Sequence, residues 1–300
     1  MMKLKRKMLG AILVSITGFA AFAIVAVVLY VMGTILIGGW DVLSWEFVSA
    51  APSEGMTAGG IFPAIVGTAL LVLIMSIAGV PIGTVTAVYL SEYASTRSFL
   101  ARLIRFAVNT LAGVPSIAFG LFGLGFFVQF VGGGLDRVLT GGAELRWAQP
   151  NILWASLTMA LLTLPVVIVS VEEAIRTVPQ DLRAASLALG ATKWQTIWHV
   201  VLPNSLTGIL TGGVLAVSRG AGEVAPILFT GAAYYLATLP HGLSDQFMSL
   251  GYHIYIMSTQ SSDVDKTMPI QFATTLVLLM LTFILNFSAV IIRTRLRKTH

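Results

Sequence analysis

Residues 172–203 read EEAIRTVPQDLRAASLALGATKWQTIWHVVLP and form the longest polar interruption on the basic-flanked side of a very apolar chain. Pro179 suits the first turn of a helix, where its missing N–H costs nothing, and Gly190 suits the left-handed position that ends a helix. Thr192 and Gln195 have the spacing of a capping box, so a second helix is expected to begin there. The stretch therefore predicts two short helices joined at a glycine.

The first of these helices is expected to carry a face with little side chain on it. Ala184, Ala185, Ser186 and Ala188 are all small, so a partner can approach that face closely. An amphipathic connector lying on the membrane surface would show the same pattern, and the residues alone leave both interpretations open. The second helix is expected to stop or kink at Pro203.

The composition excludes a soluble domain and indicates an all-α, polytopic membrane protein. Of 300 residues, 56% are hydrophobic and only 10% are charged, whereas about 25% charged residues is usual in soluble domains. Six apolar runs reach the roughly 20 residues that a membrane-spanning helix needs. The runs are 9–37, 61–89, 103–131, 152–171, 206–230 and 270–292. An even number of spans places both termini on the same side of the membrane.

The basic residues decide which side that is. Of the 18 Lys and Arg residues, 14 fall in the N-terminus, the second–third connection, the fourth–fifth connection and the C-terminus, and three fall in the other loops. Arg219 lies inside a span. Because basic residues accumulate on the cytoplasmic side, the termini and segment 172–203 are predicted to be cytoplasmic. The net charge of +5 follows this topology, so no nucleic-acid partner is expected.

The N-terminus also resembles a signal peptide, with a basic start and Ala21-Phe22-Ala23 in the place of a cleavage site. The apolar run continues unbroken to Ile37, which is too long for the apolar region of a signal peptide. An uncleaved first span is therefore favoured.

The third run holds polar and helix-breaking residues at unusual density. Asn109 and Ser116 flank Pro115, and several glycines surround them. Small residues allow helices to approach closely in lipid, and a proline frees a backbone carbonyl. Tight helix packing explains most such glycines. The functional alternative is a bent helix that lines a pathway, with Asn109 and Ser116 facing it.

The fifth run contains an arginine and a glutamate inside the predicted membrane region. Arg219 and Glu223 are four residues apart, so on a continuous helix both would project from one face, with Gly220 and Gly222 between them. A charge facing lipid at the bilayer centre is disfavoured by roughly 2.5–3.5 kcal/mol on insertion scales. Two interpretations compete: a structural ion pair, or an anion relay in which the Arg219 guanidinium binds a tetrahedral oxyanion and Glu223 moderates its charge.

Enzymatic motifs are absent from the sequence. There is no cysteine and no GxxxxGK[ST] nucleotide loop, so the chain has no means of hydrolysing ATP by that route. His241 and His253 lack metal-site spacing and are expected at the surface. Neither a catalytic residue, nor a metal, nor a cofactor is predicted, and an ATPase, if one is used, would be a separate subunit.

Segment 172–203 resembles the EAA loop of ABC importer permeases, whose pattern is Glu-Ala-Ala, three residues, Gly, nine residues and Ile-x-Leu-Pro. Anchored on Gly190, the spacing matches throughout, and the residues match at Ala185, Gly190, Leu202 and Pro203. Ala184 stands where the family often has Glu, and Ser186 and Val200 depart more mildly. In that family this loop is the coupling helix that docks in a cleft of the cytoplasmic ATPase subunit.

Two more stretches are similar to the phosphate importer permeases in particular. Gly-Val-Pro-Ser-Ile at 113–117 precedes a glycine-rich aromatic run, and Arg-x-x-Gly-Glu at 219–223 precedes Ala-Pro and Leu-Phe-Thr. The resemblance covers about residues 64–292 as a permease domain, flanked by 1–60 (tail, first span and outer loop) and the basic tail 293–300. It implies the type I ABC importer fold in a bacterial plasma (inner) membrane.

The resemblance also implies the partners and the mechanism. A second, similar permease chain, two ATPase subunits and an external phosphate-binding protein are expected, besides membrane lipid. ATP-driven closure of the ATPases would move segment 172–203, and phosphate would pass Arg219 and Glu223 by alternating access. Two alternatives remain: another oxyanion as cargo (molybdate, sulfate or phosphonate), or a non-transporting membrane sensor or scaffold. A secondary transporter is disfavoured because the two halves show no repeat.

Overall fold

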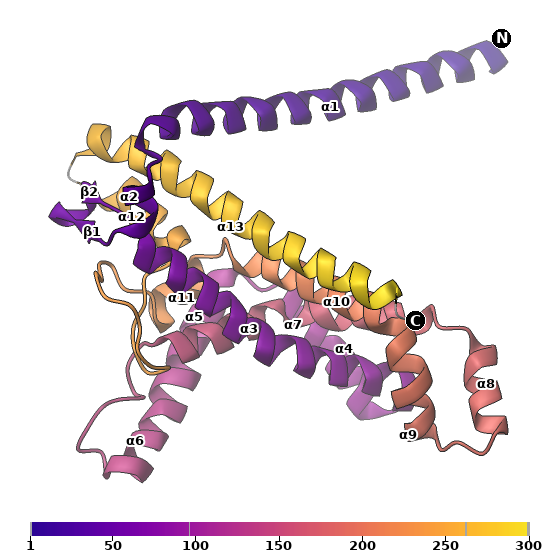
Figure 1. Cartoon of the computed structure of the whole chain (residues 1–300). Coiled ribbons are helices and arrows are strands. Elements are labelled where there is room, and N and C mark those ends of the chain that lie inside the picture. Colours follow the sequence, from indigo (N-terminus) through magenta and orange to yellow (C-terminus); the bar gives the residue numbers. More distant parts are fainter. Residues whose placement is uncertain (1, 96, 262, 299–300) are drawn as a thin grey trace.

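The computed structural model describes residues 2–95, 97–261 and 263–298, so the outermost residues of both predicted basic tails lie outside the described residues. Figure 1 shows a chain built almost wholly of helices. The α-helices are α1 (Met2–Gly39), α2 (Trp45–Ser49), α3 (Phe62–Val88), α4 (Phe99–Ala112), α5 (Ser116–Gly123), α6 (Gly133–Thr140), α7 (Ile152–Arg176), α8 (Gln180–Ala188), α9 (Lys193–Thr196), α10 (Leu202–Gly220), α11 (Ala225–Thr230), α12 (Leu250–Gln260) and α13 (Val264–Lys298). Short 3-10 turns occur at η1 (Trp40–Val42) and η2 (Glu54–Met56), and π-helical turns at η3 (Tyr89–Tyr93), η4 (Leu124–Gly132) and η5 (Ile197–Val201). An antiparallel hairpin pairs β1 (Pro52–Ser53) with β2 (Ala58–Gly59).

Six helical segments among the described residues are long and apolar enough to cross a membrane. They are Gly10–Val42, Phe62–Tyr93, Ser116–Thr140, Ile152–Arg176, Lys193–Gly220 and Val264–Ile291. The prediction of an all-α bundle with six spans is thus confirmed, although the third and fifth spans lie elsewhere along the chain than expected.

Helix α7 lies at the centre, with α3 and α10 packed along it. Small residues let these helices approach closely. A Cβ added to Gly83 of α3 would lie 2.6 Å from Cγ1 of Val167 in α7, and one added to Gly212 of α10 would lie 3.2 Å from Cβ of Ser170. Association of helices in lipid relies on such close packing because apolar burial gives no advantage there.

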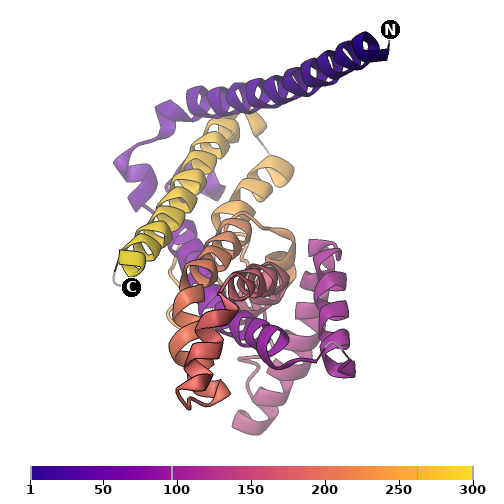
Figure 2. The ribbon, with the colours of Figure 1, turned by 90° about the vertical axis from the view of Figure 1, so that its right-hand side faces the viewer.

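Helix α1 leaves the bundle and extends away from it, as Figure 2 shows from the side of the chain ends. It contacts α13 near its own C-terminal end, where a Cβ on Gly39 would lie 2.6 Å from the backbone nitrogen of Ala273. The remaining side chains of α1 from Gly10 onward are nearly all exposed. They are apolar, which suits a helix surrounded by lipid.

Both chain ends lie toward the same end of the molecule as α8 and α9, whereas the hairpin, α2, α6 and α12 lie toward the other end (Figure 1). The expected grouping of the termini with segment 172–203 therefore agrees with the arrangement of the helices. Their location on the cytoplasmic side remains a prediction from the distribution of charge.

The third predicted span is not one helix. Helix α4 ends at Ala112, and α5 begins at Ser116 with Pro115 as its N-cap residue. Proline has no N–H to donate and disfavours the helical conformation of the residue before it. The break therefore divides the expected run 103–131 between two helices, and the candidate span begins only at Ser116.

The fifth predicted span is also interrupted. Helix α10 ends at Gly220, and α11 begins at Ala225 with Pro226 in its first turn. Glycine weakens a helix and proline suits only its first turn, so residues between them form a non-helical turn. The expected continuous helix over 206–230 is wrong, and helix continues instead in the N-terminal direction, through η5 to Lys193.

Candidate functional site

Segment 172–203 folds as its sequence predicts at three points. Helix α8 follows Pro179, Gly190 has a φ of +86° in the left-handed region, and Thr192 forms a complete capping box with Gln195. The Gln195 N–H donates to Thr192 Oγ1 at 3.3 Å, and the Thr192 N–H donates to Gln195 Oε1 at 2.8 Å. The two helices joined at a glycine are thus confirmed.

Of the two outcomes expected at Pro203, a stop or a kink, the stop is wrong. The helix continues through this residue, because α9, η5 and α10 follow one another without a gap and Pro203 lies in the first turn of α10. The π-helical turn η5 directly precedes it, and prolines and π-helical turns are both places where a helix can kink.

No other described part of the chain covers the small-residue face of α8. No residue of α8 is buried, and Ala184, Ala185 and Gly190 are all exposed. Leu187 is 50% exposed and Leu189 is 90% exposed. An isolated leucine at a surface is ordinary, but these two flank the small-residue face where α8 turns into α9. The sequence analysis did not place these two leucines in the predicted coupling set, although two leucines beside a polar turn are a readable signal.

The other members of the predicted coupling set lie behind this face. Ser186 is half-buried, and its Oγ lies 2.9 Å from Oγ1 of Thr196, which ties α8 to α9. Leu202 and Pro203 are half-buried at the start of α10. They connect the segment to the bundle instead of forming the exposed surface.

One buried ion pair fixes α8 to the second span. The Arg183 Nη2 lies 2.9 Å from Glu92 Oε1, and each side chain is 12% exposed. Arg183 also donates to the carbonyls of Ile175 and Val178 at the end of α7. Lys193 donates to the backbone carbonyl of Glu92 and lies over the Tyr93 ring. These contacts link α8 and α9 to η3 and to the end of α7.

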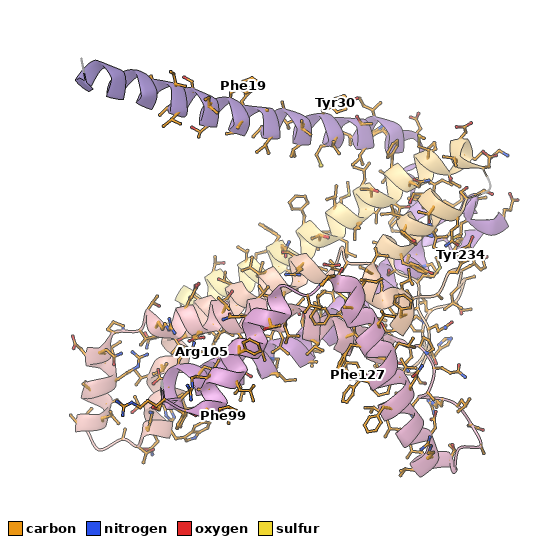
Figure 3. All side chains as sticks on the ribbon, turned by 180° about the vertical axis from the view of Figure 1, so that it is seen from behind. Phe19, Tyr30, Phe99, Arg105, Phe127 and Tyr234 are labelled. Carbon is orange, nitrogen blue, oxygen red and sulfur yellow. The ribbon has the colours of Figure 1, made fainter. Side chains whose placement is uncertain are left out.

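A second charged cluster ties α4 to the end of α7. Glu172 accepts hydrogen bonds from Arg105 at 2.5 Å and from Arg176 at 2.6 Å, and Arg105 donates to the carbonyl of Leu90 at 3.1 Å. Figure 3 shows Arg105 on α4, close to the end of the bundle that carries α8. In the sequence these arginines indicate only the orientation of the chain, and no local pattern pairs them with Glu172.

Arg219 and Glu223 do not share a helix face. Arg219 is in the last turn of α10 and is exposed, while Glu223 is half-buried in the turn between α10 and α11. Among the described residues, neither side chain forms an ion pair or a hydrogen bond. The structural ion pair considered from the sequence is thus not formed in this structure, because the helix that would have aligned the two groups ends at Gly220.

The glycines beside Arg219 differ in their surroundings. A Cβ on Gly220 would lie 2.6 Å from Sδ of Met75 in α3, so this glycine allows α10 to pack closely. Gly222 has nothing within 4 Å of such a Cβ. Gly222 is exposed, and it therefore leaves open space beside the turn that holds Glu223.

Helices α5 and α12 border the same turn. A Cβ on Gly120 of α5 would lie 3.0 Å from the carbonyl oxygen of Ala225, and one on Gly251 of α12 would lie 3.1 Å from Cγ2 of Val224. Ser116 is one helical turn before Gly120 and shares its face. Ser116 therefore lies on the side of α5 that packs on α11.

Asn109 is not grouped with these residues. It is exposed on α4, which packs on α7 and is separated from α5 by the break at Pro115. The two candidate polar residues of the third run therefore belong to different helices, and the contacts of the described residues do not bring them together.

The expectation of a surface position is right for one of the two histidines and wrong for the other. His241 is exposed as expected, but His253 in α12 is 2% exposed, and its Nδ1 has no hydrogen-bond partner among the described residues. Burial lowers the pKa of His253 from 6.5 to about 4. Its place on the inner face of a packed helix is a tertiary feature that spacing between metal ligands does not reveal. No group of three or more potential metal ligands occurs within the described part of the chain.

Comparison with known proteins decides the family. Residues 79–298 match a family described as "Binding-protein-dependent transport system inner membrane component". The chain belongs to this family of permeases. The match covers most of the predicted permease domain, and the boundaries 64 and 292 themselves stay predictions.

Individual permeases of this kind are similar over most of the chain. The "Probable ABC transporter permease protein YqgI" of Bacillus subtilis is 30% identical over 268 residues, which are 86% of each chain. The "Phosphate transport system permease protein PstA" of Pasteurella multocida is 30% identical over 245 residues, covering 81% of this chain and 77% of that protein. PstA 1 of Mycobacterium tuberculosis H37Rv is 34% identical over 215 residues, which are 70% of this chain and 64% of its own length.

Solved permeases share the fold. In a bacterial alginate ABC transporter with its periplasmic protein, one chain aligns with a TM-score of 0.62 at 17% identity, covering 90% of this permease and 92% of that chain. A chain of the MetNI methionine ABC transporter aligns with a TM-score of 0.54 at 18% identity, covering 79% and 94%. The type I ABC importer permease fold predicted from the sequence is thus confirmed. A permease of an ABC importer is a multi-pass membrane subunit that works with an ATPase and a substrate-binding protein.

Proposed function

We propose that this chain is the PstA-type permease subunit of an ATP-driven importer of inorganic phosphate. Its similarity to several PstA proteins supports the cargo, and one structural observation supports it independently. Arg219, at the end of a membrane-embedded helix, presents its guanidinium with no acidic partner among the described residues.

An unpaired arginine at this depth needs a counter-group. A charged side chain inside a membrane protein faces the bundle interior, a wet cavity or a partner, because exposure to lipid is costly. Arg219 is exposed on this chain, so in the assembled importer its surface faces the second permease across a water-filled path. A planar guanidinium offers several N–H donors to a tetrahedral oxyanion.

The surroundings of the turn between α10 and α11 suit the passage of an anion past Arg219. Gly222 leaves open space beside Glu223, and a half-buried carboxylate near the path lowers the net positive charge that the anion meets. The phosphate is then bound strongly enough to enter and weakly enough to leave. Ser116, on the face of α5 that packs against α11, is the proposed additional donor along the path.

The energy for transport enters through segment 172–203. The exposed face with Ala184, Ala185 and Gly190 docks in a PstB-like ATPase, and Ser186 with Leu202 and Pro203 transmits its movement to α9 and α10. Two PstB-like subunits, a PstC-like second permease and a PstS-like external phosphate-binding protein complete the assembly. The chain itself has no catalytic role, resides in the bacterial inner membrane, and keeps both termini in the cytoplasm.

The test is uptake by the reconstituted assembly. The chain and its three kinds of partner are placed in proteoliposomes, and ATP-dependent accumulation of labelled phosphate is measured with and without unlabelled sulfate or molybdate. We expect accumulation that neither competitor suppresses. Suppression by molybdate or sulfate would indicate that this oxyanion, and not phosphate, is the cargo. If an assembled complex accumulates no phosphate, the function is instead that of a sensor or scaffold.

A further inference from the structure

A cavity of about 350 Å³ lies beside the charged cluster at the end of the bundle that carries α8. Three elements line it: η3 with the loop after it, the first half of α4, and the end of α7. The lining residues are Leu90, Ser91, Ala94, Ser95, Ala101, Arg102, Arg105 and Arg176. The cavity is separate from the break at Arg219 and from the exposed face of α8, so the proposed transport function does not use it.

The charge on this cavity is strongly positive. Its lining includes three arginines and no acidic residue. Glu172, which lies behind them, accepts hydrogen bonds from both Arg105 and Arg176 through one oxygen, Oε1. One carboxylate thus serves two guanidinium groups. The guanidinium of Arg102 has no hydrogen bond or ion pair with any described residue.

An unsatisfied hydroxyl occurs in the same lining. The Oγ of Ser91 is buried and has no hydrogen-bond partner among the described residues. A buried polar atom without a partner is costly, and such atoms are rare in folded proteins. A hydroxyl donor beside three guanidinium groups is the donor set that a phosphate oxygen binds well.

The outer face of α4 is apolar where it borders this cavity. Phe99, Leu103 and Phe106 follow helical spacing and are 74%, 49% and 68% exposed. Acyl chains would cover these side chains in a membrane. A phospholipid whose phosphate occupies the cavity can therefore place its acyl chains against this face. Free phosphate can reach the same donors from the aqueous side.

We propose that this cavity is a binding site for a phosphate-bearing anion, held by Arg102, Arg105 and Arg176 with Ser91 as hydroxyl donor. The anion is either the headgroup of an anionic phospholipid or orthophosphate. Bound there, it joins α4 to the end of α7, directly before the segment that leads into α8. Occupancy therefore stabilises the base of the coupling segment.

The variants for the test change side chains that form no hydrogen bond or ion pair with the described residues. Arg102→Gln removes an arginine that no described residue uses, so the fold keeps its contacts. Ser91→Ala removes the hydroxyl without changing the charge. Arg97→Gln is the matched control, since Arg97 is an exposed arginine in the same connection that does not line the cavity. All are made in full-length chain carrying Arg219→Gln, which removes the arginine of the proposed transport path, so the outcome does not depend on the proposed cargo.

Two arms separate the sources of the phosphate group. In the first arm, the thermal unfolding midpoint in detergent is titrated with inorganic phosphate against chloride at equal ionic strength. In the second arm, phosphatidylglycerol is compared with phosphatidylcholine by the same midpoint and by lipid adducts in native mass spectrometry. We expect Arg102→Gln and Ser91→Ala to raise the half-saturating concentration of one ligand about tenfold or more, since charged hydrogen bonds are lost, while Arg97→Gln does not.

Each outcome has a definite meaning. A shift confined to the first arm identifies orthophosphate, and one confined to the second arm identifies the lipid headgroup. The proposal is overturned if neither ligand stabilises the parent protein, or if Arg97→Gln weakens binding as much as Arg102→Gln does. In the latter case diffuse surface charge, and not this cavity, would hold the anion.

Discussion

Arg183 of α8 and Glu92 of the second span form an ion pair with 2.9 Å between Nη2 and Oε1, although 91 residues separate them. Each side chain is 12% exposed. The pair holds the exposed coupling segment to the end of α3, and α3 in turn packs along α7. In the proposed importer, a displacement of α8 by the ATPase would therefore reach α3 and, through it, α7.

Loss of this pair should loosen the segment. Glu92→Gln leaves the buried Arg183 guanidinium without its carboxylate, and removing one partner of a buried pair costs about 3 kcal/mol or more. We expect a lower thermal midpoint and faster protease cleavage within residues 180–196. Lys266→Gln is the control, because the Lys266–Asp263 pair is exposed and such pairs contribute less than about 1 kcal/mol. Equal effects of the two substitutions would show that the buried pair has no special role.

The tip of the coupling segment should supply much of the binding to the ATPase. Leu189 is 90% exposed, and burying a leucine contributes about 1.5–3 kcal/mol. Leu189→Glu should therefore weaken ATPase association roughly tenfold or more, measured by co-purification and by stimulation of ATP hydrolysis. Leu145→Glu, an exposed leucine in the loop between the third and fourth spans, is the matched control. Undiminished association of the Leu189 variant would move the docking surface elsewhere. Gly190 is less suitable for this test, because its φ of +86° makes any side chain there a backbone perturbation.

Arg219 should be needed for uptake and dispensable for assembly. Arg219→Gln removes the charged donors from the path, and loss of charged hydrogen bonds of about 1.5–3 kcal/mol predicts roughly a tenfold to hundredfold slower phosphate uptake. Arg219→Lys keeps the charge without the planar set of donors and should be intermediate. Uptake in proteoliposomes is compared with the yield of intact complex. Normal uptake by the Gln variant would remove Arg219 from the mechanism.

Burial of His253 should make the folded chain less stable in acid. Its pKa is about 4 in the folded chain, because of burial, and 6.5 when exposed. The unfolded state therefore binds the proton first as pH falls, and stability is lost between about pH 6.5 and 4. At pH 5 the loss is about 2 kcal/mol, from 1.36 kcal/mol for each pKa unit.

The measurement is the unfolding midpoint from pH 8 to pH 4.5 for the parent and two variants. His253→Leu removes the buried imidazole and should flatten the acid limb. His241→Leu, at an exposed position, should retain it. An unchanged acid limb in the His253 variant would assign the sensitivity to other groups.

Local features were predictable from the residues themselves. The six spans follow from the length of the apolar runs, and the Gly190 turn and the Thr192 capping box follow from short-range backbone chemistry. Each of these depends on contacts within a few residues or on transfer of a whole segment into lipid. These local contacts and the transfer of an apolar segment into lipid contribute the same free energy whatever the rest of the chain does.

Other features depended on contacts between distant segments. The glycines and Pro226 near Arg219 are local signals for a break in the helix, but the close approach of Met75 of α3 to Gly220 is a tertiary contact that the sequence does not show. The pairing of Glu92 with Arg183, the convergence of Arg105 and Arg176 on Glu172, and the burial of His253 have the same origin. Sequence spacing states which groups a chain carries, whereas packing across helices decides which groups lose water and find one another, and that loss of water sets their energies.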